Sequence, residues 1–315
     1  MKFFSTLFAS AKTGEVNEQK VDMKNFDMLK FDGIRALRIN KPAYALKCFT
    51  EALHIQKDLE TMKYLLVACN SLEKNDLALE TLNEMVGLGE EPATALLMRS
   101  DFYYRMGNYA EASADCEQII ALEPDNCVAY FYLAKSTLAM GERTKAISHL
   151  DKATDLKDDF AEAFALRADI YLAMEKCHEA LSDIEKVIEL LPEDEAAYLL
   201  RGRIYEQMGN DEAALSEYQQ TLERNPFHEA AYLLAGRILM AQGKNDEAIA
   251  LFDEAIEHID QFAQAYAARA LAKHQSGDHD GALADEETAK ELNPDEAEKP
   301  DENHNFDNLY KGGIF

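Results

Sequence analysis

Long apolar runs and catalytic signatures are both missing from this sequence of 315 residues. No stretch approaches the roughly 20 consecutive apolar residues that a transmembrane helix needs, so we expect no membrane span. There is no glycine-rich phosphate loop, no H-E-x-x-H pair and no nucleophile elbow. We therefore expect no enzymatic activity, no cofactor and no metal centre.

Basic residues are scarce relative to acidic ones. The chain has 32 Lys and Arg against 59 Asp and Glu, for a net charge of −27. Residues 1–58 hold 10 basic and 7 acidic residues, a balance of +3, whereas the rest holds 22 and 52, a balance of −30. Such a chain repels phosphates and has no basic stripe, which argues against binding to nucleic acid. The acidity favours basic partners, or simply reflects solvated helix faces.

Cysteine usage argues against a disulfide-bonded protein. The five cysteines are odd in number and form no C-x-x-C pair. We expect free thiols that pack as small hydrophobic groups, which suits a reducing compartment. The predicted localisation is therefore cytoplasmic.

What the chain does contain is an internal repeat. One alanine recurs after 33 residues once and after 34 residues six times, and these alanines are Ala45, Ala78, Ala112, Ala146, Ala180, Ala214, Ala248 and Ala282. A fixed period of this length indicates stacked supersecondary units that share one continuous core.

Each repeat is predicted to be a pair of helices. In residues 195–228, the first helix runs from Glu195 to about Met208, and Gly209 provides a left-handed stop. The second helix begins near Asp211, which can cap its free amides, and stops before Pro226. Small residues in the first helix allow the two helices to approach closely, and aromatic residues fill the space between neighbours.

Spacing, small residues, aromatic residues and prolines together resemble those of tetratricopeptide repeat (TPR) proteins. The resemblance covers residues 26–296, although the usual tryptophan is absent and the unit 59–92 is weak, with bulky Leu66 in a small position and Glu73 in place of the turn glycine. It implies an all-α, right-handed superhelix of antiparallel helix pairs. The implied repeats are 26–58, 59–92, 93–126, 127–160, 161–194, 195–228, 229–262 and 263–296, between an N-terminal extension (1–25) and a C-terminal tail (297–315).

Two positions of the repeat vary together. In the four repeats whose seventh residue is arginine, the twenty-third residue is an acid. In the other four repeats the seventh residue is not arginine and the twenty-third is not an acid. We predict a structural ion pair between the two helices of each such repeat, because a partly buried charge needs its partner. The predicted pairs are Arg99 with Asp115, Arg167 with Asp183, Arg201 with Glu217, and Arg269 with Asp285.

In TPR proteins the first helices line a concave groove, mainly through positions such as 5, 9 and 12. The resemblance therefore implies a non-catalytic scaffold or adaptor that binds a protein or peptide segment there. The predicted contact residues are Tyr104, Phe131, Lys135, Leu138, Leu172, Leu199, Arg203, Leu233, Arg237 and Met240. Alternatively, Lys135 pairs with Asp101 and Arg203 with Asp169 to support the repeats, and Glu206 reaches Arg237.

The two ends and one histidine cluster leave alternatives open. Phe3, Phe4, Leu7 and Phe8 could pack on the first repeat, serve as a signal segment, or contact a partner or membrane, which would make the protein a peripheral membrane assembly factor. The apolar tail 306–315 either covers the last helix pair or acts as a docking peptide. Open ends also permit self-association. His274, Asp278, His279 and Asp280 suggest turn and capping residues more than a metal site.

Overall fold

The computed structural model describes residues 22–293, and every regular element within that range is an α-helix. The prediction of an all-α fold is confirmed. The chain divides into two compact units, Met1–Leu156 (unit 1) and Lys157–Phe315 (unit 2). Each unit is described separately below.

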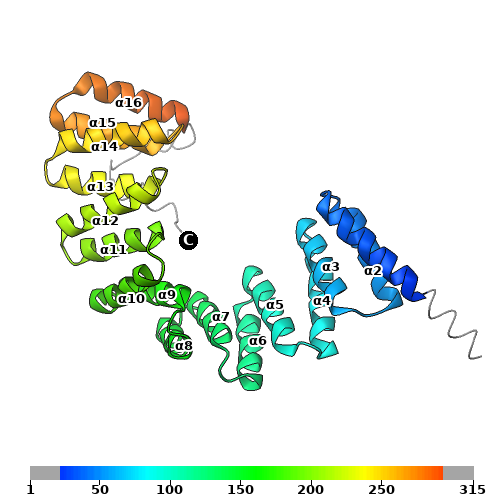
Figure 1. Ribbon diagram of the computed structural model, residues 1–315. Coiled ribbons are helices and arrows are strands. Elements are labelled where there is room, and N and C mark those ends of the chain that lie inside the picture. The colour runs from blue at the N-terminus through cyan, green and yellow to red at the C-terminus, as the bar shows by residue number, and fades with distance from the viewer. Residues whose placement is uncertain (1–21, 294–315) are drawn as a thin grey trace, which may run out of the picture. The chain divides into compact units, whose positions relative to one another are not determined.

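Unit 1 begins with a helix over residues 22–38 and continues with short helices joined by tight turns (Figure 1). These are α2 (Pro42–Ile55), α3 (Leu59–Ser71), α4 (Asn75–Leu88), α5 (Pro92–Arg105), α6 (Tyr109–Leu122), α7 (Cys127–Ala139) and α8 (Arg143–Leu156). The weak stretch 59–92 also folds as a helix pair, because Glu73 adopts the left-handed conformation (φ 54°) that a turn glycine would take.

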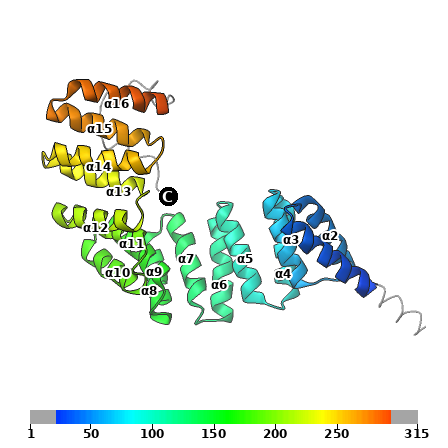
Figure 2. The ribbon, with the colours of Figure 1, turned by 45° about the horizontal axis from the view of Figure 1, so that its top comes forward.

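Unit 2 repeats the same pattern, and Figure 2 shows its helices stacked in successive pairs. They are α9 (Ala161–Ala173), α10 (Cys177–Leu190), α11 (Glu195–Gln207), α12 (Asp211–Arg224), α13 (Glu229–Ala241), α14 (Asn245–His258), α15 (Ala263–Ser276) and α16 (His279–Leu292). Each of the eight predicted repeat ranges thus contains two helices, and the division into repeats itself stays a prediction.

Local signals explain where the helices end. Gly209 has a φ of 75°, the left-handed conformation expected of it after α11. The cap of α12 differs from the prediction: Asn210, not Asp211, is the N-cap, and its side chain accepts a hydrogen bond from the Ala213 amide. Asp211 is instead the first helical residue, where its charge favours the positive end of the helix dipole.

The core of each helix pair depends on a small residue facing a large one. A Cβ built on Gly236 would lie 2.1 Å from Phe252, and one on Gly202 would lie 2.5 Å from Tyr218. Phe252 and Tyr218 are fully buried. The glycines therefore allow the two helices to pack across an aromatic ring. None of the helices within residues 22–293 is both long enough and apolar enough to cross a bilayer.

Candidate partner-binding site

The structure brings all four Arg–acid pairs together within their repeats. The distances from arginine Nη2 to the carboxylate oxygen are 2.6 Å for Arg99–Asp115, 2.7 Å for Arg167–Asp183, 2.8 Å for Arg201–Glu217 and 2.6 Å for Arg269–Asp285. The four acids are largely buried, with side-chain exposure between 3% and 12%. These arginines hold the two helices of a repeat together, which leaves partner binding to other residues.

Arg99 and Arg269 also reach the preceding repeat, a contact that the pattern of positions 7 and 23 did not predict. Arg99 Nη1 donates to Asn83 Oδ1 at 2.8 Å, and Arg269 Nη1 donates to Asp253 Oδ1 at 2.6 Å. Both acceptors lie 16 residues before the arginine, whereas the predicted acids lie 16 residues after it. In these two repeats the seventh position therefore contacts the twenty-fifth position of the repeat before it.

In unit 1, the predicted contact residues form a cluster of aromatic rings around Lys135. The Lys135 ammonium lies 4.8 Å from the ring centre of Tyr104, 5.1 Å from Tyr132 and 5.9 Å from Phe131. Such cation–π contacts stabilise an ammonium group without neutralising it. Leu138, on the same helix α7, is half-buried. The lysine charge is thus held on an aromatic surface.

Within residues 22–293, no salt bridge joins Asp101 to Lys135, so the alternative pairing is not formed. The Asp101 carboxylate accepts a hydrogen bond from Arg105 Nε at 3.0 Å, one turn further along α5. Asp101 and Arg105 lie at the rim of a cavity of about 290 Å³. Its apolar wall includes Leu66, Leu82 and Phe102. The cavity is a feature that the predicted contact residues did not include.

In unit 2, a larger cavity of about 460 Å³ collects charged side chains from α9, α11 and α13. Three predicted contact residues line it: Leu172, Arg203 and Arg237. Residues that the sequence analysis left out of the contact set also line it: Asp169, Ala173, Glu175, Glu206, Gln207 and Leu234. The first helices of three consecutive repeats therefore meet at one hollow, as expected for positions 9 and 12.

Glu206 organises one side of this cavity. Its Oε1 accepts a charge-assisted hydrogen bond from Arg237 Nη2, and its Oε2 accepts one from the Tyr218 hydroxyl at 2.8 Å. Burial, together with the neighbouring Glu206 carboxylate, raises the pKa of Tyr218 above its usual range, so the hydroxyl stays protonated and remains a donor. The suggested contact between Glu206 and Arg237 is therefore present, and it fixes the arginine in place.

Arg203 and Asp169 occupy the other side of the cavity. Burial raises the pKa of Asp169, while the nearby charge of Arg203 lowers it. Within residues 22–293, however, no salt bridge or hydrogen bond joins the side chains of these two residues to each other or to another side chain. The suggested Asp169–Arg203 ion pair is thus not made, and the Arg203 guanidinium borders the cavity with its hydrogen-bonding capacity available.

Four predicted contact residues are buried, and one of them, Leu172, is 6% exposed in the apolar cluster of α9 to α11 although it also lines the cavity of unit 2. Leu199, Leu233 and Met240 are buried, with 9% exposure or less, in the apolar cluster formed by α11 to α15. Positions 5 and 12 are buried there because α13 packs against α12, α14 and α15 and shares one apolar cluster with Leu199 of α11. We correct their assignment from partner contact to core.

The histidine cluster forms hydrogen bonds at the turn between α15 and α16. His274 Nδ1 lies 3.2 Å from His279 Nδ1, and His274 Nε2 lies 3.0 Å from Glu286 Oε1. The Asp278 side chain caps α16 by accepting from the Gly281 amide. Within the described part of the chain, no group of three or more His, Cys, Asp or Glu side chains is arranged to hold a metal ion. The predicted contacts of Phe3, Phe4, Leu7 and Phe8, and of the tail 306–315, lie outside the described residues.

Sequence comparisons agree with the architecture. A family model described as tetratricopeptide repeat matches residues 165–229, 205–263 and 233–297, and a second model of the same description matches residues 103–170. Together these matches span residues 103–297, well over half of the chain. This chain belongs to the tetratricopeptide repeat family. A search of curated protein sequences found no match.

Solved structures with the TPR fold resemble this one at low sequence identity. The C-terminal part of a TPR repeat-containing protein from Cytophaga hutchinsonii is 19% identical, with a TM-score of 0.61, over 76% of this chain and 96% of that one. A TPR protein from Parabacteroides merdae is 16% identical, with a TM-score of 0.58, over 82% and 99%. The pilF protein of Pseudomonas aeruginosa is 18% identical, with a TM-score of 0.54, over 66% and 97%. At these identities the likeness establishes the fold alone.

Proposed function

We propose that this TPR protein is a non-catalytic scaffold that binds a segment of another protein along its first helices. Family membership supports this proposal, because the family serves mainly in protein interaction. The lining of the two hollows supports it too: the hollow of unit 1 is mostly apolar, and the hollow of unit 2 combines charged side chains with Leu172, Ala173 and Leu234. That combination suits recognition of an extended peptide or a partner helix.

The observation that carries the proposal is the available guanidinium of Arg203 in the unit 2 cavity. A carboxylate side chain of a partner would form a charge-assisted, bidentate hydrogen bond with it. Arg237 contributes its positive charge beside Glu206. Because residues 157–315 hold 14 basic and 36 acidic residues, a generally acidic peptide would be repelled. The partner segment we propose therefore has one Asp or Glu among basic and apolar residues.

Unit 1 offers contacts of a different kind. Its cavity of about 290 Å³ has mostly apolar walls, which suit a leucine or phenylalanine side chain. The nearby rings of Tyr104 and Tyr132 hold Lys135 on the surface, where its ammonium can donate a hydrogen bond to a carboxylate or carbonyl oxygen of a partner. We propose that unit 1 binds an apolar part of a partner and unit 2 an acidic side chain.

The test is a paired pull-down from native lysate, read by mass spectrometry. The baits are the wild type, Arg203→Glu, and Lys244→Glu as a control that changes the net charge equally at an exposed position of unit 2. Arg237 is left unchanged, because its loss would also release Glu206 and Tyr218. We expect a set of proteins that is lost only with Arg203→Glu, after circular dichroism shows equal helicity.

The opposite result has a clear meaning. If the three baits capture the same proteins, the unit 2 cavity is not the binding site. The binding site would then be assigned to the acidic outer surface or to the chain ends. A peptide array made from any captured protein would then check the proposed charge pattern. Binding that is insensitive to replacing the single Asp or Glu would exclude the role of Arg203.

A second candidate function is that of a peripheral membrane assembly factor located in the cytoplasm. It depends on Phe3, Phe4, Leu7 and Phe8, and is favoured by the exposed Phe31 near the start of the described chain. Co-sedimentation with vesicles of phosphatidylcholine and phosphatidylserine would test it. Loss of vesicle binding upon deletion of residues 1–12 is the expected result, and equal behaviour of both proteins would exclude this function.

A further inference from the structure

Neighbouring repeats in this protein pack through two recurring apolar positions. The twenty-first residue of one repeat and the sixth residue of the next lie in the same apolar cluster. In unit 2 these are Leu181 with Leu200, Leu215 with Leu234, and Ile249 with Ala268. In unit 1 they are Leu46 with Tyr64, and Leu79 with Met98. At these five junctions each repeat thus provides one half of the contact, whereas the twenty-first residue of repeat 93–126 is Ser113.

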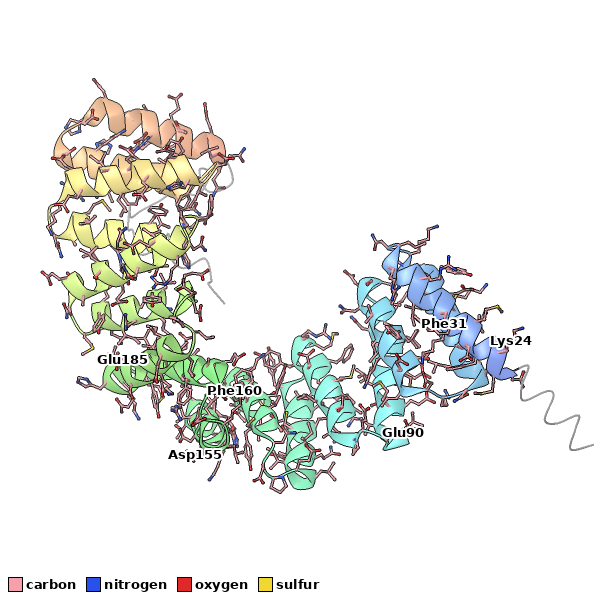
Figure 3. All side chains as sticks on the ribbon, viewed as in Figure 1. Lys24, Phe31, Glu90, Asp155, Phe160 and Glu185 are labelled. Atoms are coloured by element: carbon pink, nitrogen blue, oxygen red, sulfur yellow. The ribbon has the colours of Figure 1, made fainter. Side chains whose placement is uncertain are left out.

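At the two ends of the described chain, one half of this contact has no counterpart. Phe31, the sixth residue of the first repeat, is 63% exposed, and Leu283, the twenty-first residue of the last repeat, is 58% exposed. The equivalent residues of all other repeats are buried or half-buried. Figure 3 labels Phe31 on the helix over residues 22–38, and Figure 1 places α16 at the end of unit 2.

The third residue of the repeat adds to the exposed face on this first helix. Met28 is 56% exposed, whereas the equivalent residues in the other seven repeats are Thr or Ala with 3% exposure or less, namely Thr61, Ala95, Ala129, Ala163, Ala197, Ala231 and Ala265. A flexible Met and a Phe together form an apolar surface that suits another apolar surface more than water.

We propose that a second copy of this chain covers these faces, in a head-to-tail arrangement. Leu283 on α16 of one copy packs against Phe31 of the next copy, and so repeats the contact that joins consecutive repeats inside the chain. A head-to-tail contact is heterologous, so it produces a ring or an open filament instead of a closed dimer. This inference does not depend on the proposed scaffold function.

One charged pair makes the proposed contact weak and also makes it testable. At two places inside the chain the seventh position contacts the twenty-fifth position of the preceding repeat: Arg99 contacts Asn83, and Arg269 contacts Asp253. At the head-to-tail contact these positions are Asp32 and Glu287. Two carboxylates would face each other there, which opposes association. The wild type is therefore expected to associate reversibly, and only at high protein concentration.

The experiment measures mass against concentration by sedimentation velocity, up to the solubility limit. Asp32→Arg replaces the repulsion with attraction to Glu287, so we expect roughly tenfold tighter association. Glu287→Arg should tighten it equally by pairing with the native Asp32. The double variant Asp32→Arg/Glu287→Arg restores like charges and should be as weak as the wild type. This pattern of tight and weak association is expected only if residue 32 of one copy faces residue 287 of the other.

Two further variants separate the apolar contact from the charges. Phe31→Asp in the Asp32→Arg background should abolish association, whereas Val67→Asp, at another exposed apolar residue of unit 1, should leave it unchanged. Circular dichroism checks that all variants remain helical. The proposal is overturned if Asp32→Arg stays monomeric, or if the double variant associates as tightly as either single variant.

Discussion

At the scale of single residues, the two helices of a repeat complement each other at an offset of 16. The offset joins Arg99 to Asp115, and it also joins small residues to large ones, as in Gly33 with Phe49 and Gly236 with Phe252. Where the first helix has a glycine, the second has an aromatic ring. A change of side-chain size or charge at one of these positions therefore needs a matching change at the residue 16 positions away.

This complementarity predicts the effect of adding one methyl group. Gly236→Ala would place a Cβ 2.1 Å from the Phe252 ring, which is fully buried and cannot move aside. Overpacking should lower the free energy of unfolding by about 1–2 kcal/mol, after allowing for the better helix propensity of alanine. The midpoint of urea unfolding, followed by circular dichroism, measures the change.

The control for this substitution is Gly87→Ala in α4. Nothing lies within 4 Å of a Cβ at Gly87, so alanine should stabilise the protein by about 0.5–1 kcal/mol. Adding Phe252→Leu to Gly236→Ala should recover part of the loss. Equal effects at Gly236 and Gly87 would contradict the proposed packing.

The buried ion pairs predict a second large effect on stability. Arg99→Ala leaves the Asp115 carboxylate, whose side chain is 3% exposed, without its bidentate partner. Loss of one partner of a buried pair should destabilise the protein by about 3 kcal/mol. Arg105→Ala is the matched control, because its pair with Asp101 is exposed and should contribute less than about 0.5 kcal/mol. Thermal unfolding of both variants would distinguish them, and similar losses would argue against a special role for Arg99.

At the scale of elements, the last helix pair differs from the others in what holds it together. Glu286 occupies the position that an apolar or aromatic residue fills in the seven earlier repeats, so the last pair lacks an apolar core residue there. Instead, Asp285 on α16 accepts hydrogen bonds from Arg269, and Lys273 lies 2.8 Å away. The α15–α16 contact therefore depends on charge more than on apolar packing.

This dependence predicts that the pair loses stability in acid. Burial tends to raise the pKa of Asp285, but hydrogen bonds from Arg269 and Lys273 lower it below the ordinary value of 3.8. A carboxyl whose pKa is lowered in the folded state stabilises that state above its unfolded pKa, and the stabilisation disappears as the pH falls through the folded pKa. We therefore expect the contribution of Asp285 to be full at neutral pH and to be lost below about pH 4.

The measurement compares wild type with Asp285→Asn by urea unfolding at pH 7 and in strong acid. The variant should be less stable at pH 7 and should approach the wild type as the pH falls below 3.8, the ordinary value for this carboxyl. Asp280→Asn, an exposed change on the same helix, should follow the wild type throughout. A stability difference that does not depend on pH would show that Asp285 acts through packing instead.

Another element, the pair α3 and α4, shows how one bulky residue changes a repeat. Leu66 stands where other repeats have Gly, Ala or Ser, and it faces Leu82 across the pair at the same offset of 16. Both residues line the cavity of unit 1. A repeat that looks weak in the sequence is therefore a helix pair with a hollow beside it, which is where we place an apolar part of the partner.

At the scale of the whole molecule, charge is distributed unequally between the two units. Residues 1–156 hold 18 basic and 23 acidic residues, whereas residues 157–315 hold 14 and 36. Unit 2 thus has a balance of −22, against −5 for unit 1. Such a field speeds the approach of basic partners and weakens with salt, while in our proposal the cavity with Arg203 selects a local acidic group.

The sequence by itself determined the elements of this protein and their pairing. A period of 34 residues placed the helix pairs, because an apolar pattern that repeats so regularly permits only one local structure. The covariation of positions 7 and 23 identified Arg99, Arg167, Arg201 and Arg269 as partners of acids, since a buried charge cannot be left alone. The family followed from the same spacing.

Only the tertiary structure decided which first-helix side chains remain accessible. Leu199, Leu233 and Met240 share positions with half-buried residues of other repeats, yet they are buried because they lie in one apolar cluster contributed by α11 to α15. Lys135 lies on aromatic rings and Arg237 on Glu206, contacts that join different repeats. Periodicity describes one helix at a time. Exposure and charge pairing depend on how closely neighbouring helices pack, which is a property of the assembled repeats.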